Sequence, residues 1–299
     1  MSFRNTVRFL AGRLALIGFA LLFSSLVRGA QPTPESLAAW QAHVQQAKTS
    51  LGQCVRGESA FLLINHDGPV EKRVRDGRII VTHSNAGGMI HVPNGLIHDW
   101  TGTVFIPGAH TNDVTAVLQD YQAYAATYRP AVIQSHLVNR DRNQFRYQLK
   151  FQANSFGVKA GLLGDFRSIY WTEDARHSYS TTEATHLVEL ANPGSPGERE
   201  LSPEEARGYV QRTFTIVRYN EADGGVYMEV QAMSLSRDIP AALRWAVAPL
   251  VERFSRQVLT TTLEKFRSRV SSTLVGAQAK GPAGGDCLVS SPGCGNGLP

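Results

Sequence analysis

Residues 144–152, QFRYQLKFQ, alternate polar side chains with aromatic or aliphatic ones. The apolar members are Phe145, Tyr147, Leu149 and Phe151. Successive side chains of a strand point to opposite faces of its sheet, so this period of two predicts a strand with one buried face. Such half-buried strands are typical of antiparallel sheets. We therefore expect an antiparallel sheet whose apolar face is covered by another element.

The period of two extends from residue 131 to residue 236, which predicts a meander of about six strands. Asp223-Gly224 is a strong hairpin signal between the last two strands, and a longer loop is expected from residue 192 to about 207. The expected strands are 131–138, 144–152, 158–172, 176–190, 208–219 and 225–236.

A long amphipathic helix follows the meander and is the expected cover of its apolar face. Asp238 can cap this helix, and Pro240 stands in its first turn. Pro249 lacks an amide proton and is expected to kink or break the helix near residues 246–249. Phe254 is expected to be buried, so Phe254→Asp should destabilise the fold by several kcal/mol. The apolar stripe consists of Leu243, Val247, Leu250, Val251, Phe254, Val258, Leu263, Phe266 and Val270.

Two further helices and several short strands are expected before the meander. Thr33-Pro34-Glu35 is a helix start, and apolar spacings of three and four predict a helix over 34–51. Thr111 can cap a second helix that ends at Arg129-Pro130, since a residue before proline avoids the helical region. The expected strand segments are 61–65, 73–75 and 78–83 around Asp76-Gly77, and 89–92 and 97–106 around Asn94-Gly95.

The N-terminal segment is expected to direct export. Arg4, Arg8 and Arg13 precede an apolar run over 14–27, which is the layout of a secretory signal. We expect residues 1–29 to be a signal peptide cleaved after Gly29, with an uncleaved anchor as the alternative. The mature protein would be periplasmic or secreted. The full chain has a formal charge of +5, but four arginines leave with this segment, so the nearly neutral remainder has no general attraction for nucleic acid.

The C-terminal segment 276–299 is rich in Gly, Ser and Pro and is expected to be disordered, which places one folded domain at 30–275. Cys287 and Cys294 lie near each other in this tail. An exported compartment permits disulfides, but the sequence leaves open whether these two cysteines pair. If these two cysteines pair, Cys54 remains as a buried thiol.

Three blocks of sequence resemble the START-like, or SRPBCC, superfamily of helix-grip proteins, and in particular its exported bacterial members. They are residues 94–109 (NGLIHDWTGTVFIPGA), residues 114–121 (VTAVLQDY), and residues 224–230 with 234–240 (GGVYMEV, SLSRDIP). The resemblance implies an α+β fold in which a curved antiparallel sheet wraps around a long C-terminal helix, with an N-terminal helix and one helix after the first strands. It also implies an apolar cavity. The superfamily includes lipid carriers, hormone receptors, polyketide cyclases and dioxygenase domains, so the fold does not fix the function.

The expected function is binding or transport of a lipid or other apolar or amphipathic small molecule between the sheet and the C-terminal helix. Arg167, Glu183 and Arg212 each share a strand face with apolar residues. They must either pair, meet a ligand head group or face outward. The basic side of the last helix would also allow transient contact with anionic lipid. The expected cavity wall is Trp100, Phe145, Tyr147, Leu149, Arg167, Trp171, Glu183, Arg212, Phe214, Val251, Phe254 and Val258.

No catalytic motif is found in the sequence. The nine histidines form no His-Glu-x-x-His, and the cysteines form no Cys-x-x-Cys. A Gly-x-Ser-x-Gly elbow and a Gly-rich phosphate loop are also missing. We therefore assign no catalytic residue, metal or cofactor. The alternatives are a cyclase- or hydrolase-like enzyme with strand-borne acids or bases in the same cavity, and a partner-binding envelope protein with a filled core.

Overall fold

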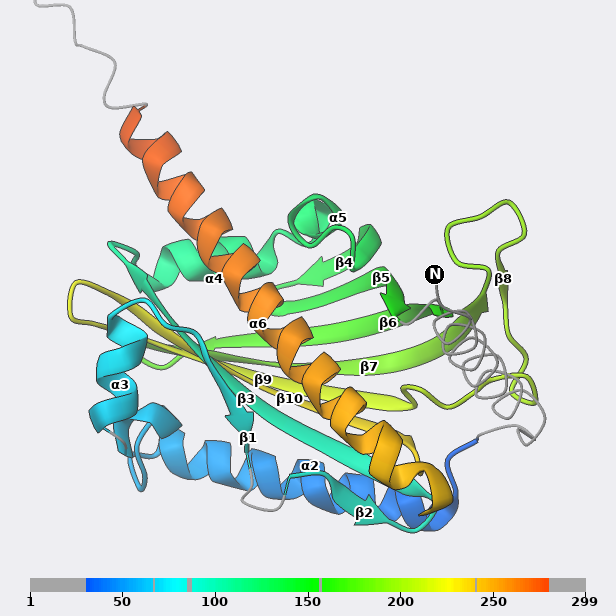
Figure 1. The fold of residues 1–299 in the computed structure, drawn as a ribbon. Coiled ribbons are helices and arrows are strands. Elements are labelled where there is room, and N and C mark those ends of the chain that lie inside the picture. Colours follow the sequence, from blue (N-terminus) through cyan, green and yellow to red (C-terminus); the bar gives the residue numbers. More distant parts are fainter. Residues whose placement is uncertain (1–30, 67, 85–87, 156–157, 240, 280–299) are drawn as a thin grey trace, which may run out of the picture.

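The computed structural model describes residues 31–66, 68–84, 88–155, 158–239 and 241–279. Its centre is an antiparallel ten-stranded sheet with the strand order β1-β3-β10-β9-β7-β6-β5-β4, in which β2 also pairs with β3 and β8 with β7 (Figure 1). The expected α+β class is confirmed. The expected signal peptide, Cys287 and Cys294 lie outside the described residues.

The strands agree with most of the alternating segments of the sequence, and β3, β4, β5 and β10 are longer than expected. β5 contains the alternating stretch from which the sheet was predicted. The strands are β1 (Ile80–His83), β2 (Ile90–Val92), β3 (Gly95–Pro107), β4 (Val132–Asp141), β5 (Gln144–Ser155), β6 (Val158–Thr172), β7 (His177–Ala191), β8 (Arg199–Glu200), β9 (Arg212–Ala222) and β10 (Gly225–Arg237).

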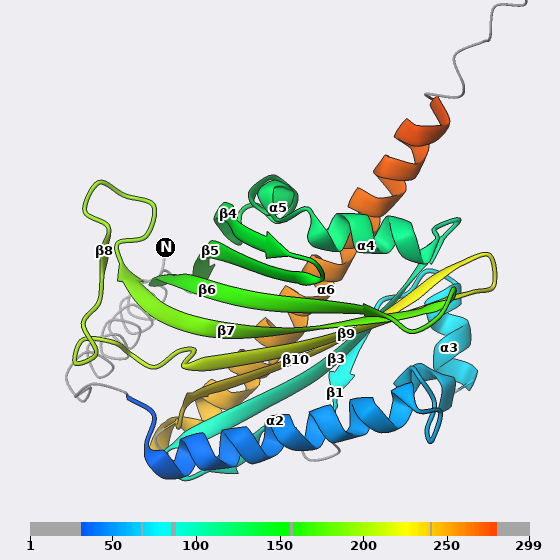
Figure 2. The ribbon, with the colours of Figure 1, turned by 180° about the vertical axis from the view of Figure 1, so that it is seen from behind.

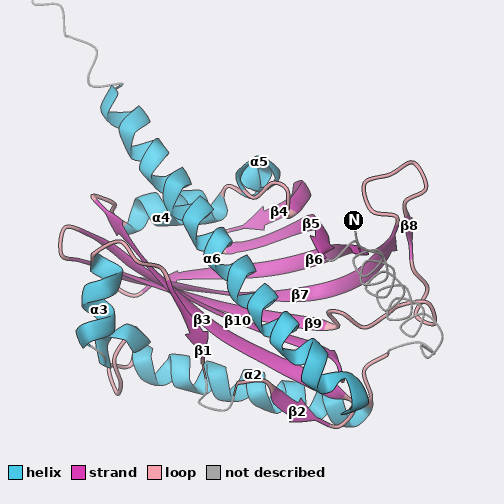
Figure 3. Ribbon diagram, in the orientation of Figure 1, coloured by secondary structure: helices cyan, strands magenta, loops and turns pink. Residues whose placement is uncertain are grey.

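Helices lie on both faces of the sheet. The long helix α6 (Ala241–Ala279) runs diagonally across one face, here called the inner face (Figure 3). The helix α2 (Pro34–Val55) lies along the opposite, outer face, as the view from behind shows (Figure 2). Thr33 caps α2 as expected, because its hydroxyl accepts a hydrogen bond from the amide of Ser36.

The second half of α6 packs closely on the inner face. A side-chain carbon at Gly102 of β3 would lie 2.7 Å from Leu263 and 3.0 Å from Leu259. Phe266 and Val270 continue this buried stripe. Sheet and helix therefore interlock here, and the gap expected between them does not extend along this part of α6.

Three expectations about α6 differ from the structure. The helix continues through Pro249 without a break, although proline removes one hydrogen bond. It also runs to Ala279, beyond the expected end of the folded domain at residue 275. Phe254 is 41% exposed rather than buried.

The expected hairpin around Asp76-Gly77 is wrong, because residues 73–75 belong to the helix α3 (Gly68–Arg75). Gly77 has φ +93 and donates to the carbonyl of Val74, while the Arg78 amide donates to Arg73. This is the hydrogen-bond pattern of a glycine-terminated helix. A glycine with positive φ serves a helix end as well as a hairpin, so the dipeptide alone does not distinguish them.

Two other N-terminal segments also differ from expectation. Residues 61–65 are not a strand; the 3-10 turn η1 (Leu63–His66) occupies most of this segment. The expected helix from residue 111 to 129 is divided into α4 (Thr111–Gln119), the 3-10 turn η2 (Tyr121–Ala123) and α5 (Tyr124–Thr127). The cap of α4 is His110 rather than Thr111.

Candidate functional site

A row of paired residues crosses the inner face from one side of the sheet to the other. Each residue of the row lies opposite the next one on the neighbouring strand. The row has an aromatic residue at each end and small or hydroxyl-bearing residues in the middle. The row is Trp100, Ala232, Thr215, Thr182, Ser168 and Phe145, from β3, β10, β9, β7, β6 and β5. The middle of the inner face therefore offers hydroxyl groups between apolar ends.

The hydroxyls form a chain of hydrogen bonds that begins in the core. Tyr147 Oη lies 3.1 Å from Ser168 Oγ, which lies 2.6 Å from Thr182 Oγ1. Burial raises the pKa of Tyr147, so its hydroxyl stays protonated. Ser168 is buried, whereas Thr182 and its neighbour Thr215 are only half-buried. This series of hydrogen-bonded hydroxyl groups therefore ends at a side chain that is partly accessible from outside.

The first half of α6 carries an apolar stripe that the described residues leave partly exposed. Leu250, Phe254 and Val258 follow at spacings of four and are 39%, 41% and 43% exposed. Residues seven positions apart lie on nearly the same side of a helix, so Lys265 shares a side of α6 with Val258. Lys265 donates to the carbonyl of Arg129, which follows α5. The stripe therefore points along the inner face toward the α5 side of the sheet.

The structure divides the twelve residues of the expected cavity wall among three places. Phe145, Tyr147 and Leu149 lie in the buried inner-face core, together with Trp100. Trp100 is only 4% exposed. The centroid of its ring lies 3.7 Å from that of the His83 ring and 5.6 Å from the guanidinium carbon of Arg256. Half-buried Val251 and the exposed Phe254 and Val258 lie on α6.

The remaining five expected residues lie on the outer face, so they do not share a cavity with the others. Arg167, Trp171, Glu183 and Phe214 line a separate pocket beside α2. Arg167 and Glu183 pair with each other, which is one of the three arrangements the sequence left open. Arg212 is exposed at the start of β9 and donates to the Gln211 carbonyl.

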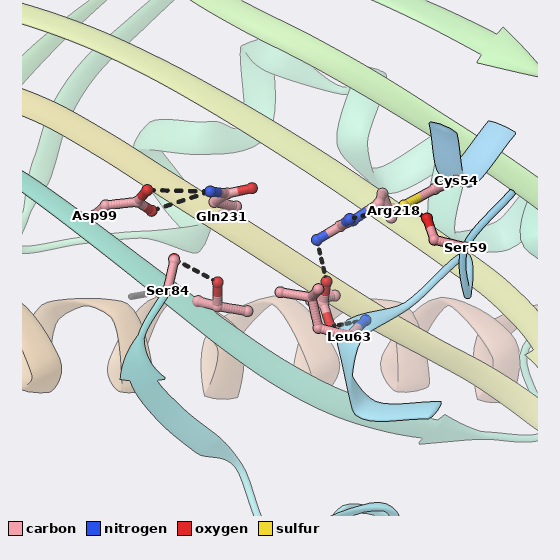
Figure 4. A network of polar contacts seen from close by, with 9 residues as sticks. Cys54, Ser59, Leu63, Ser84, Asp99, Arg218 and Gln231 are labelled. Carbon is pink, nitrogen blue, oxygen red and sulfur yellow. Dashed lines mark hydrogen bonds and ion pairs between the residues drawn. The ribbon is translucent and has the colours of Figure 1, made fainter. Parts of the chain in front are cut away.

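A buried ion pair on the outer face was missed by the sequence analysis. Arg218 of β9 and Glu229 of β10 pair across the hairpin with side chains 4% and 0% exposed. Glu229 also accepts a hydrogen bond from the Leu63 amide, and Arg218 Nη1 lies 3.8 Å from Cys54 Sγ (Figure 4). Burial raises the pKa of Glu229, and the Arg218 charge opposes that rise. The pair anchors α2 and η1 to the sheet.

A second polar contact ties α2 to the sheet. His43 Nε2 lies 2.9 Å from Asp99 Oδ2, and Gln231 donates to both Asp99 oxygens (Figure 4). Asp99 turns away from its neighbour His98, which instead contacts Ser236 on the other face at 2.9 Å. Adjacent residues of a strand point to opposite faces of the sheet, which is why His98 and Asp99 have different partners.

The described residues show neither a candidate metal site nor a membrane-spanning helix. No group of three or more His, Cys, Asp or Glu side chains there could hold a metal ion. No helix formed by the described residues is long and apolar enough to cross a membrane.

No protein-family model matches the sequence, and no curated protein is similar to it. Solved structures with a similar fold include a STAR-related lipid transfer protein fragment from Xanthomonas axonopodis. Its identity is 18% and its TM-score 0.43, over 64% of this chain and 98% of that one. Human STARD10 has 11% identity and a TM-score of 0.43, over 76% and 87% of the two chains.

The di-domain ARO/CYC StfQ from the steffimycin biosynthetic pathway is also similar. Its identity is 11% and its TM-score 0.39, over 60% of this chain and 52% of that one. At these identities and TM-scores, the likeness does not extend to what this chain binds.

Proposed function

We propose that the protein binds a lipid or another amphipathic small molecule between the inner face of the sheet and the first half of α6. The observation that carries this proposal is the uncovered stripe of Leu250, Phe254 and Val258 beside an inner face whose hydroxyl chain ends at half-buried Thr182. The stripe suits the apolar part of a ligand, and the hydroxyls suit its polar group.

The expected gain from burying the stripe is moderate. Complete burial of a Leu, Val or Phe side chain contributes about 1.5–3 kcal/mol, so removing the remaining exposure contributes about 1 kcal/mol for each residue. Loss of ligand freedom offsets part of that gain. The middle residues of the inner-face row carry methyl and hydroxyl groups rather than carboxylates or imidazoles, which favours binding over acid–base catalysis.

Native mass spectrometry of the purified protein, before and after exposure to a bacterial lipid extract, tests the proposal. We expect bound lipid on the wild type and little on Phe254→Asp, because a carboxylate in the stripe opposes an apolar chain. Val275→Asp is the matched control, since Val275 is an exposed apolar residue of the same helix outside the stripe. A wild type free of lipid under both conditions, or equal loading of the two variants, would contradict the proposal.

Delivery of such a ligand would involve contact with a membrane surface. The start of α6 presents Trp245, which is 81% exposed, and the exposed Arg253 and Arg256 follow. Tryptophan is favoured at membrane interfaces, and arginine is attracted to anionic headgroups. Co-sedimentation with phosphatidylglycerol vesicles should therefore exceed that with phosphatidylcholine vesicles and decrease in Trp245→Ala. Equal sedimentation with both vesicle types would contradict membrane contact.

Export to the periplasm or the medium is part of the proposed function. It rests on the basic start and apolar run of residues 1–29. N-terminal sequencing of the protein recovered from outside the cytoplasm should begin at Ala30. Recovery of the chain with Met1 only in the cytoplasm would contradict export.

A further inference from the structure

A pocket of about 380 Å³ lies on the outer face, between the second half of α2 and the strands β6, β7 and β9. One wall is a stripe of α2 with Lys48, Leu51 and Val55 among its members. The floor consists of side chains on the same face of three adjacent strands. The pocket is separated from the inner face by the sheet itself, so it is a different place from the lipid site proposed above.

The floor carries a stacked pair of aromatic rings. Trp171 and Tyr179 are partners across β6 and β7, and their rings stack with centroids 4.8 Å apart and planes 16° apart. Both side chains are only half-buried, so the stack has an accessible side. The neighbouring floor residues Ile169 and Thr181 are also half-buried and extend this surface. A planar ring can stack on such a surface with its edges against aliphatic groups.

The charged residues of the pocket favour an anion. Arg167 is neutralised by Glu183, and Arg56 by Glu58, which lies outside the lining. Lys48 differs, because it forms no ion pair with any described residue. Its ammonium instead lies 4.9 Å from the centroid of the Phe214 ring. A solvated cation thus lies at the edge of an apolar floor, and no carboxylate of the described residues pairs with it.

We propose that this outer-face pocket binds a planar aromatic carboxylate, with the ring stacked on Trp171 and Tyr179 and the carboxylate at Lys48. The volume lies within the usual range for small-molecule pockets. An aromatic cation would also stack on the floor, but Lys48 would repel it. The proposal does not depend on lipid binding at the inner face.

Fluorine NMR of the full chain labelled with 5-fluorotryptophan tests the proposal, because its four tryptophans report on different places. Trp171 is in the pocket, Trp40 is in the core beneath α2, Trp100 is under α6 and Trp245 begins α6. The probe is 2-naphthoate, and Trp→Phe variants assign the signals. We expect a saturable shift of the Trp171 signal at millimolar naphthoate or below, with the Trp100 and Trp245 signals unchanged.

Two comparisons separate charge recognition from simple stacking. The uncharged 2-naphthamide should bind about fivefold more weakly than 2-naphthoate, the effect of about 1 kcal/mol for an exposed ion pair. Lys48→Glu should weaken naphthoate binding by at least that factor and leave naphthamide binding unchanged. Lys159→Glu is the matched control, since Lys159 is an exposed lysine that does not line the pocket.

The outcomes decide between this pocket and other sites. A shift of Trp100 or Trp245 without one of Trp171 would place the aromatic acid at α6 and overturn the proposal. Equal affinity for naphthoate and naphthamide, or no effect of Lys48→Glu, would overturn the role of Lys48. Failure of lipid binding at the inner face would leave the Trp171 result unaffected, so the two proposals are tested separately.

Discussion

At the scale of single residues, the Arg218–Glu229 pair combines complete burial with full hydrogen bonding on the carboxylate side. Removing one partner from a buried pair leaves the other charge without compensation, which costs more than the pair contributes. The Leu63 amide adds a second requirement, because its hydrogen bond needs an acceptor at position 229.

Arg218→Met should therefore destabilise the protein by about 3–5 kcal/mol. In a Glu229→Gln background the same change should cost much less, since the amide oxygen still accepts from Leu63 and no carboxylate is left buried alone. Urea unfolding of the four proteins in this cycle measures the coupling. Equal costs of Arg218→Met in the two backgrounds would show that the ion pair contributes nothing.

His98 makes the stability depend on pH. Burial, with a smaller contribution from His83, lowers the pKa of His98 from 6.5 to about 4. Between pH 6.5 and about pH 4, His98 is therefore protonated in the unfolded chain and neutral in the folded protein. Stability is unaffected above about pH 6.5 and should fall by about 3 kcal/mol as the pH approaches 4.

His98→Gln should remove this part of the acid sensitivity. Melting temperatures measured from pH 7 to pH 4 would give a shallower decrease for the variant than for the wild type. Parallel curves would mean that His98 is accessible to protons in the folded protein.

The sequence contains a pattern that predicts the buried Arg218–Glu229 pair, although the sequence analysis did not use it. The hairpin at Asp223-Gly224 fixes the register of β9 against β10, and that register places 218 opposite 229. Opposite charges at paired positions within apolar strands indicate a buried pair. His43 could not be assigned in the same way, because its contact with Asp99 depends on where α2 lies against the sheet.

At the scale of elements, the crossing of α6 over β3 depends on Gly102. A methyl group there would lie closer to Leu263 than carbon atoms tolerate, so the helix would have to shift. Overpacking of this kind costs about 1–3 kcal/mol. We expect Gly102→Ala to destabilise the protein by that amount in thermal or urea unfolding.

Gly276 is the matched control, because it lies in the same helix with no atom near the position of an added carbon. Gly276→Ala should be neutral or stabilise α6 by up to about 1 kcal/mol. Equal effects of the two substitutions would show that α6 does not pack closely on β3.

Element types were predictable where the period was long, and less so near turns. The alternation in β5 and the stripe of α6 each continue over many residues, so local exceptions do not hide them. Asp76-Gly77 was ambiguous because one backbone conformation serves two structures. Pro249 was misleading because packing elsewhere along α6 offsets the loss of one hydrogen bond.

At the scale of the whole molecule, the cover of the sheet differs between its two sides. β3 lies between α6 and α2, and all its residues from 95 to 106 are buried. β4 is the last strand of the sheet and is largely exposed beyond Leu137. Local opening should follow this difference.

Amide hydrogen exchange should accordingly be slowest in β3 and β10 and fastest in β8 and the second half of β4. Mass spectrometry of peptic fragments would resolve these segments. Faster exchange in β3 than in β4 would contradict the proposed coverage of the sheet by two helices.

The same scale explains why the expected cavity wall was divided. A period of two tells which residues of a strand share a face, and Arg167 and Trp171 do share one. It does not tell which face of the sheet α6 covers, because both faces of this sheet carry apolar residues and α2 covers the second one. The register of the strands places Phe145 and Phe214 on opposite faces, and only the placement of the two helices tells which of these faces α6 covers.

The register of β4 against β5 shifts twice, between Val132 and Gln134 and between Leu137 and Asn139. Irregularities at a border strand twist its free amides and carbonyls away from a straight line, and Arg140 and Asp141 add charge at its end. A second molecule therefore finds no regular template for adding a strand there. Resistance to edge-to-edge aggregation at this border strand follows.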